Sequence, residues 1–194
     1  MTATRILGID PGLNTTGYAV IEALNAGPKL LEAGVIRSAE RRDTADMAER
    51  LKTLYDGVIE VMDQYKPTTM AVEQLYAHYD HPRTAILMAH ARGAILLGAG
   101  QRGLTVTSYA ATQIKKTVTG SGRAGKEQMQ LAILREFRLS EMPEPADVAD
   151  ALAIALCHFH LRNVASPQSA AGSRSSRGVN LEALLKDQRE ATKD

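Results

Sequence analysis

The 194-residue sequence has a single cysteine, Cys157, so no disulfide bond can form within the chain. Cys157 lies in an apolar helical pattern, which predicts a buried, unreactive thiol in a reducing compartment. No run of about 18 apolar residues occurs, so we expect no membrane span. The N-terminus runs directly into a predicted strand and lacks the apolar core of a signal peptide. We therefore expect a cytoplasmic protein without a membrane partner.

An excess of charge of either sign is also missing, because 23 Lys and Arg residues face 22 Asp and Glu residues, for a net charge of +1. The overall charge therefore does not indicate a nucleic-acid partner. Between Gln101 and Arg135, however, basic residues greatly outnumber the single acid, Glu127. These basic residues are Arg102, Lys115, Lys116, Arg123, Lys126 and Arg135. Such a patch can contact phosphate groups, although an ordinary solvated surface explains the charges equally well.

Hydrophobic periodicity predicts a mixed α/β sheet in one domain that spans residues 1–163. The predicted strands are 4–9, 17–24, 30–37, 69–73 and 104–108, and the predicted helices are 44–65, 82–101, 110–116, 126–138 and 145–162. The first three strands read as an antiparallel meander, with a turn at 25–28. Residues 164–194 are rich in Ser, Gly and Arg, so we predict a disordered tail and assign it no activity.

Four acidic residues occupy matching places in this pattern. Asp10 and Glu73 each end a short apolar run that reads as a buried strand, and Asp147 and Asp150 are three apart at the start of an apolar helix. Carboxylates gathered in this way favour a site for hard divalent cations such as Mg²⁺. A cation pair about 3.5–4 Å apart is the usual device for in-line phosphodiester cleavage.

Each acid also has a simpler structural explanation. Asp10 can cap its own Pro-Gly turn, and Glu73 can be an edge-strand charge that limits aggregation. Asp147 and Asp150 can complement the helix dipole. All of these explanations together require three independent coincidences, which favours the cation site.

Short motifs in a fixed order resemble the RuvC-type Holliday-junction resolvases. They are Gly-Ile-Asp-Pro-Gly with Thr16-Gly17-Tyr18, Ala-Val-Glu-Gln (71–74), Ala91-Arg92-Gly93, Tyr109-Ala110-Ala111 with Lys115 and Lys116, and Ala-Asp-Val-Ala-Asp-Ala-Leu-Ala-Ile-Ala (146–155). The matches cover roughly residues 5–160 with similar spacing, and together they are specific. The resemblance implies a ribonuclease-H-like five-stranded sheet flanked by helices. It also implies a homodimer that resolves four-way junctions by paired symmetric nicks in recombination and repair.

The resemblance also implies roles for individual residues. Asp10, Glu73, Asp147 and Asp150 would hold two Mg²⁺ ions, with Mn²⁺ as a substitute, although some members have His at the position of Asp147. Lys126 would stabilise charge during cleavage. The expected DNA contacts are Tyr76, Lys115, Lys116, Arg123 and Lys126. The branch-migration proteins RuvA and RuvB are expected partners on the same ground.

The predicted helix 82–101 is apolar around most of its girth, so it needs partners on two sides. One side can pack on its own sheet, and the other is our candidate dimer interface or the site of another helix of the chain. A two-fold enzyme would present two sites with the symmetry of a junction.

Three competing functions remain open at this stage. The Gly-Ile-Asp-Pro-Gly-Leu-Asn-Thr-Thr-Gly segment also resembles the first phosphate loop of sugar kinases and actin-like ATPases, but the chain shows no second domain or phosphate loop. A junction-binding protein without catalysis would have no use for four carboxylates facing phosphate. A ribonuclease H or a resolvase-like RNA-processing nuclease is compatible with the four acids alone.

Overall fold

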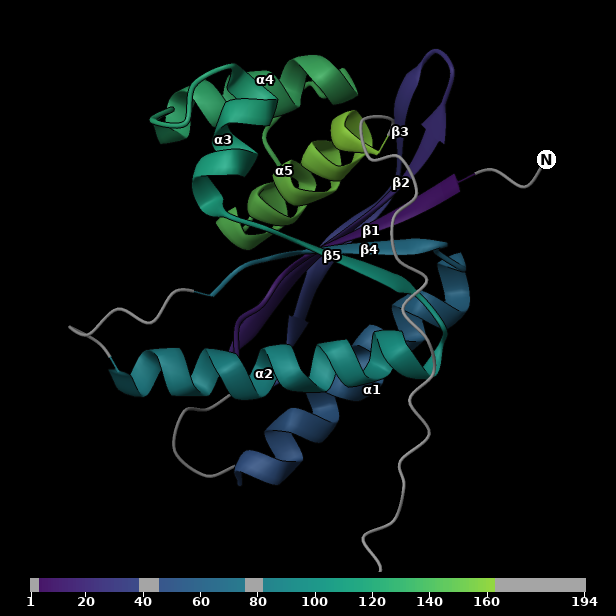
Figure 1. The fold of residues 1–194 in the computed structure, drawn as a ribbon, viewed down its shortest axis with the longest axis vertical. Helices are drawn as coiled ribbons and strands as arrows, with labels where there is room; N and C mark the ends of the chain where they lie inside the picture. The colour runs from purple at the N-terminus through teal and green to yellow at the C-terminus, as the bar shows by residue number, and fades with distance from the viewer. Residues whose placement is uncertain (1–3, 39–45, 76–81, 163–194) are drawn as a thin grey trace, which may run out of the picture. The chain divides into compact units, whose positions relative to one another are not determined.

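The protein forms the predicted mixed sheet between two layers of helices. A computed structural model describes residues 4–38, 46–75 and 82–162. Its elements are β1 (Thr4–Asp10), β2 (Thr15–Leu24), β3 (Gly27–Arg37), α1 (Met47–Tyr65), β4 (Thr69–Glu73), α2 (Pro82–Gln101), β5 (Thr105–Tyr109), α3 (Ala111–Thr119), α4 (Lys126–Phe137) and α5 (Ala146–Leu161) (Figure 1). No helix within these ranges is long and apolar enough to cross a membrane.

The sheet has the strand order β3-β2-β1-β4-β5. β1, β2 and β3 pair antiparallel, as predicted for the meander, whereas β4 runs parallel to β1 and β5 runs parallel to β4. The parallel pairs are possible because α1 and α2 return the chain to the starting end of the sheet. The carboxyl ends of β1 and β4 consequently meet at the same edge.

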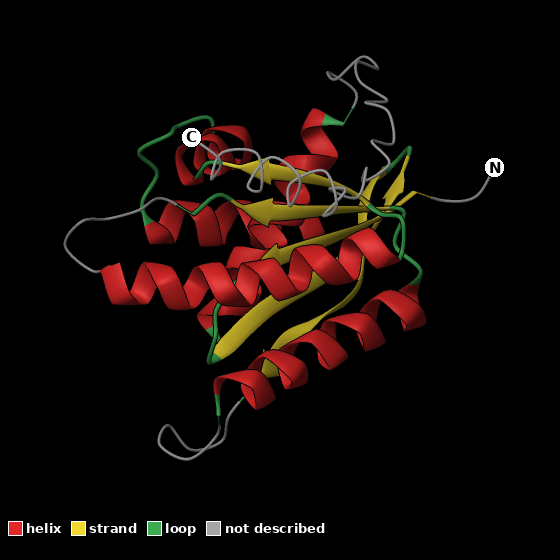
Figure 2. Cartoon of the chain, turned by 60° about the horizontal axis from the view of Figure 1, so that its bottom comes forward, coloured by secondary structure: helices red, strands yellow, loops and turns green. Residues whose placement is uncertain are grey.

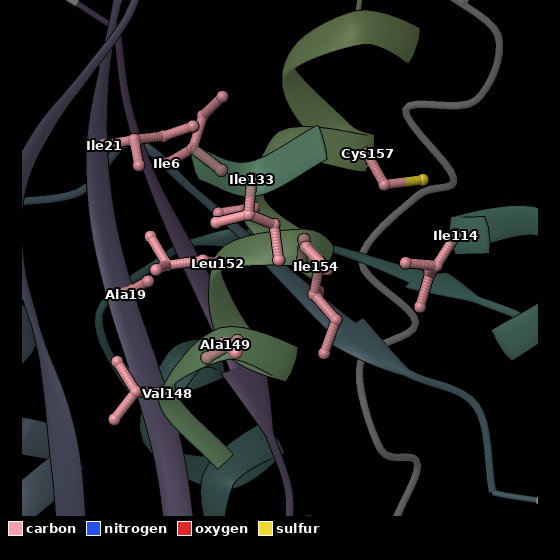
Figure 3. Packing of buried hydrophobic residues seen from close by; sticks show 14 of the residues in the cluster. Ile6, Ala19, Ile21, Ile114, Ile133, Val148, Ala149, Leu152, Ile154 and Cys157 are labelled. Atoms are coloured by element: carbon pink, nitrogen blue, oxygen red, sulfur yellow. The ribbon is translucent and has the colours of Figure 1, made fainter. Parts of the chain in front are cut away.

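The two faces of the sheet carry separate apolar cores, because successive strand residues point in opposite directions. On β1, Ile6 packs in the core formed with α5, and Leu7 and Ile9 pack in the core formed with α1 and α2. Figures 1 and 2 show the sheet between these two helical layers, and Figure 3 shows the core beneath α5, with Leu152 against Ala19.

Two glycines let α5 lie directly on β1 and β2. A Cβ atom at Gly8 would stand 2.4 Å from the carbonyl oxygen of Ala151, and one at Gly17 would stand 2.0 Å from the carbonyl oxygen of Asp147. Neither distance is compatible with a side chain, so glycine is required at both positions. This close approach brings the first turn of α5 to the end of β1.

Three local predictions need correction or fall outside the described residues. β3 begins at Gly27, so only Asn25 and Ala26 form the turn, and Pro28 lies within the strand. This is allowed because β3 is an edge strand, where proline's missing N–H removes no ladder bond. α3 continues to Thr119 rather than ending at residue 116. The predicted disorder of residues 164–194 lies outside the described ranges.

Candidate active site

The fold brings the four predicted carboxylates together at one edge of the sheet. Asp10 is the last residue of β1 and Glu73 the last residue of β4, and these strands are parallel neighbours. Asp147 and Asp150 lie in the first turns of α5. Gly17, which faces Asp10 across the β1–β2 ladder, is the residue against which the backbone of Asp147 packs. Residues more than 130 positions apart are thereby placed at one site.

Burial and mutual repulsion raise the pKa values of three of the four carboxyl groups, those of Asp10, Glu73 and Asp150. Burial first, and then the charges of Asp150, Glu73 and Asp147, raise the pKa of Asp10 from 3.8 to about 7. Burial and the charge of Asp150 also raise the pKa of Glu73, and nearby Lys115 opposes this. The pKa of Asp150 is raised by partial burial and by Asp147, against the opposing charges of Lys126 and Lys115.

The donor chemistry of the site fits hard divalent cations. All four side chains offer carboxylate oxygens, which are the ligands that Mg²⁺ and Mn²⁺ favour. A cation would neutralise the charge that raises the pKa of Asp10. Within the described ranges, however, no three acidic, histidine or cysteine side chains are spaced to enclose one ion. The charges of the carboxylates therefore act on one another's pKa values, but the carboxylates do not form a closed coordination shell.

A cleft of about 450 Å³ opens beside the carboxylates. Glu73 and Asp150 line it together with the two predicted lysines, Lys115 from α3 and Lys126 from the start of α4. Its deeper wall is apolar and includes Ile114, Ile133 and Ile154. Two acidic and two basic side chains therefore line one cleft, and their charges act on one another.

Two other predicted DNA contacts, Lys116 and Arg123, are not brought into this cleft. Lys116 and Arg123 are exposed, and neither lines it. Tyr76 lies outside the described residues. Lys115 and Lys126 are thus the predicted cations that the structure sets beside the carboxylates.

One residue at the site, Arg92, was assigned no role by the sequence analysis. Its Nε donates to the backbone carbonyl of Glu73 at 3.4 Å, and its Nη2 donates to the hydroxyl of Ser108 at 2.7 Å. The available signal was an arginine in the middle of a largely apolar helix, since a charge in such a place requires partners.

The family model described as "Crossover junction endodeoxyribonuclease RuvC" matches residues 6–158. The chain belongs to the RuvC family. It is 54% identical over 164 residues to the crossover junction endodeoxyribonuclease RuvC of Rhodopirellula baltica, a match that covers 84% of this chain and 89% of the relative. The RuvC of an Azoarcus species is 40% identical over 178 residues, with 92% and 94% covered. Membership makes the chain an endonuclease, as the resemblance implied.

Solved RuvC structures agree with the fold. The Thermus thermophilus RuvC structure matches with a TM-score of 0.76 at 30% identity, covering 83% of this chain and 96% of the other. The T. thermophilus RuvC in complex with Holliday junction substrate matches with a TM-score of 0.77 at 31% identity, with the same shares covered. The predicted ribonuclease-H-like fold is therefore confirmed.

Proposed function

We propose that Asp10, Glu73, Asp147 and Asp150 hold two Mg²⁺ ions, with Mn²⁺ as a substitute, and that the protein uses them to resolve four-way DNA junctions. The observation that carries the proposal is the convergence of four carboxylates around Asp10, whose pKa is raised to about 7. A group of like charges is costly to maintain unless a cation compensates it. Concentrated carboxylates at a cleft that also contains lysines fit phosphodiester cleavage better than simple DNA binding.

In this proposal the acidic side chains hold the cations, and the lysines act on the DNA phosphates. Divalent cations held there would supply an activated water and stabilise the leaving 3′ oxygen, giving 5′-phosphate and 3′-hydroxyl ends. Asp10, which is half-buried, and Glu73 supply the carboxylates at the strand ends. Lys126 stabilises the negative charge that develops on the phosphoryl oxygens, and Lys115 holds the DNA backbone beside them. Lys116 and Arg123 would contact the DNA further from the scissile phosphate, and Tyr76 would contact it on the ground of family resemblance.

Lys126→Ala is expected to reduce the single-turnover cleavage rate by about a hundredfold, because a positioned charge at the reacting phosphate is lost. The control is Lys116→Ala, since Lys116 is exposed and outside the cleft. That variant should weaken junction binding a little, with a rate within about threefold of wild type at saturation. Equal rate losses in the two variants would assign Lys126 a binding role only.

The protein would work as a homodimer, with α2 at the interface. Ala91, Ile95 and Ala99 of α2 are fully buried against the sheet and α1, whereas Ile86 and Leu97 are 57% and 58% exposed. A Cβ atom at Gly93 would meet nothing within 4 Å, so a second backbone has room to approach there. An exposed apolar helix face of this kind is typical of a subunit contact. RuvA and RuvB are proposed as partners on family resemblance alone.

Leu97→Glu is expected to raise the dimer dissociation constant by at least about a hundredfold, because it buries a carboxylate in the contact. Sedimentation velocity over a concentration series measures this. Leu131→Glu on α4 is the matched control, since Leu131 is also exposed, at 47%, on a different helix. Unchanged sedimentation of the Leu97 variant would remove α2 from the interface.

The decisive experiment is cleavage of a synthetic mobile four-way junction in Mg²⁺, in Mn²⁺ and in EDTA, with nick mapping. Metal-dependent, symmetric, ligatable nicks, absent on linear duplex, are the expected result. Tight binding without nicks in either metal would refute the nuclease mechanism and leave a structural DNA binder.

A further inference from the structure

The end of β4 is held by an arginine from a helix on one face of the sheet. Glu73 ends β4, and the regular ladder with β5 stops there. Beyond it, the N–H of Gln74 donates to the carbonyl of Tyr109 at 2.8 Å. The carbonyl of Glu73, in the same peptide group, accepts the Nε of Arg92. This peptide group is therefore fixed on both its N–H and its C=O sides.

Arg92 is itself anchored at a second point. Its Nη2 bonds the hydroxyl of Ser108 at 2.7 Å, which is shorter than its 3.4 Å bond to Glu73. Ser108 lies on β5, opposite Val72 in the ladder. One planar guanidinium group thus bridges the ends of two neighbouring strands, because its Nε–H and Nη2–H donors form a rigid fork. A lysine ammonium has no comparable fixed fork.

The helix holds Arg92 firmly enough for this role. Ala91 beside it and Ile95 one turn on are both fully buried in the core between α2 and the sheet. Lys115 is the cation that lowers the pKa of the Glu73 carboxyl group, whereas Arg92 bonds the backbone carbonyl of Glu73. A bond to the backbone carbonyl constrains the peptide group from which the Glu73 side chain leaves the strand.

We propose that Arg92 is a positioning residue that fixes the backbone of Glu73 and thereby sets the affinity of the site for divalent cations. The inference rests on the proposed function of Glu73 as a cation ligand. Outer groups that orient a ligand side chain typically change metal affinity by about 10–100-fold when removed. Arg92 acts through the backbone, so the low end of this range applies. α2 also carries the proposed dimer face, so this bond connects the interface helix to the cation site.

The test is Mn²⁺ binding to the full-length protein without DNA, measured by electron paramagnetic resonance of free Mn²⁺. Arg92→Gln is expected to raise the Mn²⁺ dissociation constant about tenfold. Ser108→Ala, which removes only the anchor, should raise it about threefold, and Arg92→Lys should fall between wild type and Arg92→Gln. Arg102→Gln is the matched control, because Arg102 follows α2 directly and pairs with Asp63 on α1. It should leave Mn²⁺ affinity unchanged.

Junction-binding and cleavage assays distinguish a role of Arg92 in cation affinity from a direct role in DNA binding. In EDTA, Arg92→Gln should bind the junction within about twofold of wild type, and excess Mn²⁺ should restore most of its cleavage rate. Wild-type Mn²⁺ affinity in this variant would overturn the proposal, and so would weaker junction binding with unchanged Mn²⁺ affinity. If circular dichroism shows that Arg92→Gln is unfolded, Ser108→Ala and Arg92→Lys decide by the same criteria. Failure of the wild type to bind Mn²⁺ or to cut junctions would instead refute the proposed function.

Discussion

Asp10→Asn is expected to reduce junction cleavage by at least about a thousandfold, which corresponds to about 4 kcal/mol of lost transition-state stabilisation. Asp10 is the most central of the four acids, since the other three all act on its pKa. The amide keeps the shape of the side chain and removes the charge that a cation would bind. Junction affinity in EDTA should stay the same or rise slightly, because a negative charge near phosphate is removed. Burst cleavage and gel-shift titration measure the two effects.

The same substitution is expected to stabilise the protein when divalent cations are absent. The ordinary pKa of 3.8 describes Asp10 in the unfolded chain, and the folded-state pKa is about 7. The folded state therefore binds more protons between these values, so the contribution of Asp10 to stability is most favourable below about pH 4 and is lost as pH rises through about 7. The full difference corresponds to about 4 kcal/mol, and relaxation around the site leaves an expected gain of about 1–2 kcal/mol at pH 8.

Urea unfolding in EDTA at pH 5 and pH 8 measures this gain. Wild type should lose stability between the two pH values more than Asp10→Asn does, and Mg²⁺ should stabilise only the wild type strongly. Asp56→Asn is a suitable control, because Asp56 is an exposed carboxylate paired with Lys52 and its removal should gain nothing. An Asp10 variant that is less stable than wild type at pH 8 would show that Asp10 has a structural role.

The positions of Asp10 and Glu73 could be predicted because local sequence determines them. Each apolar run stops at an acid, and two neighbouring parallel strands carry these ends to one edge. Asp147 and Asp150 could be placed on one helix face by their spacing of three. The order of the strands, which makes β1 and β4 neighbours, was not predicted, since period-two patterns do not specify partners.

The remaining features depend on contacts between distant residues, which periodicity does not encode. The bond from Arg92 to Glu73 joins residues 19 apart in different layers. Pro28 reads as a turn residue until β3 is known to be an edge strand. Likewise, the sequence shows that Gly17 lacks a side chain, but only the fold shows that the backbone of Asp147 requires this.

Gly17→Ala is accordingly expected to move the carboxylates on α5, Asp147 and Asp150, away from those at the strand ends, Asp10 and Glu73. The added methyl group would meet the carbonyl oxygen of Asp147 at 2.0 Å and its carbonyl carbon at 2.6 Å, so either α5 or β2 must move. Because both partners are backbone, no rotamer change relieves the contact, and we expect a loss of about 2–4 kcal/mol in unfolding free energy.

A shift of about 1 Å at Asp147 would move Asp147 and Asp150 away from Asp10, which is expected to reduce cleavage by at least about a hundredfold even where the variant is folded. Urea unfolding and cleavage at a temperature where circular dichroism shows native structure separate the two losses. Gly100→Ala is the control, since a Cβ atom there meets nothing within 4 Å on an exposed helix end. It should retain full activity and gain up to about 1 kcal/mol. If Gly17→Ala retained wild-type stability and cleavage, α5 could not lie on β2 as closely as the structure has it. The contact between Gly17 and the backbone of Asp147 would then not be what holds the four carboxylates together.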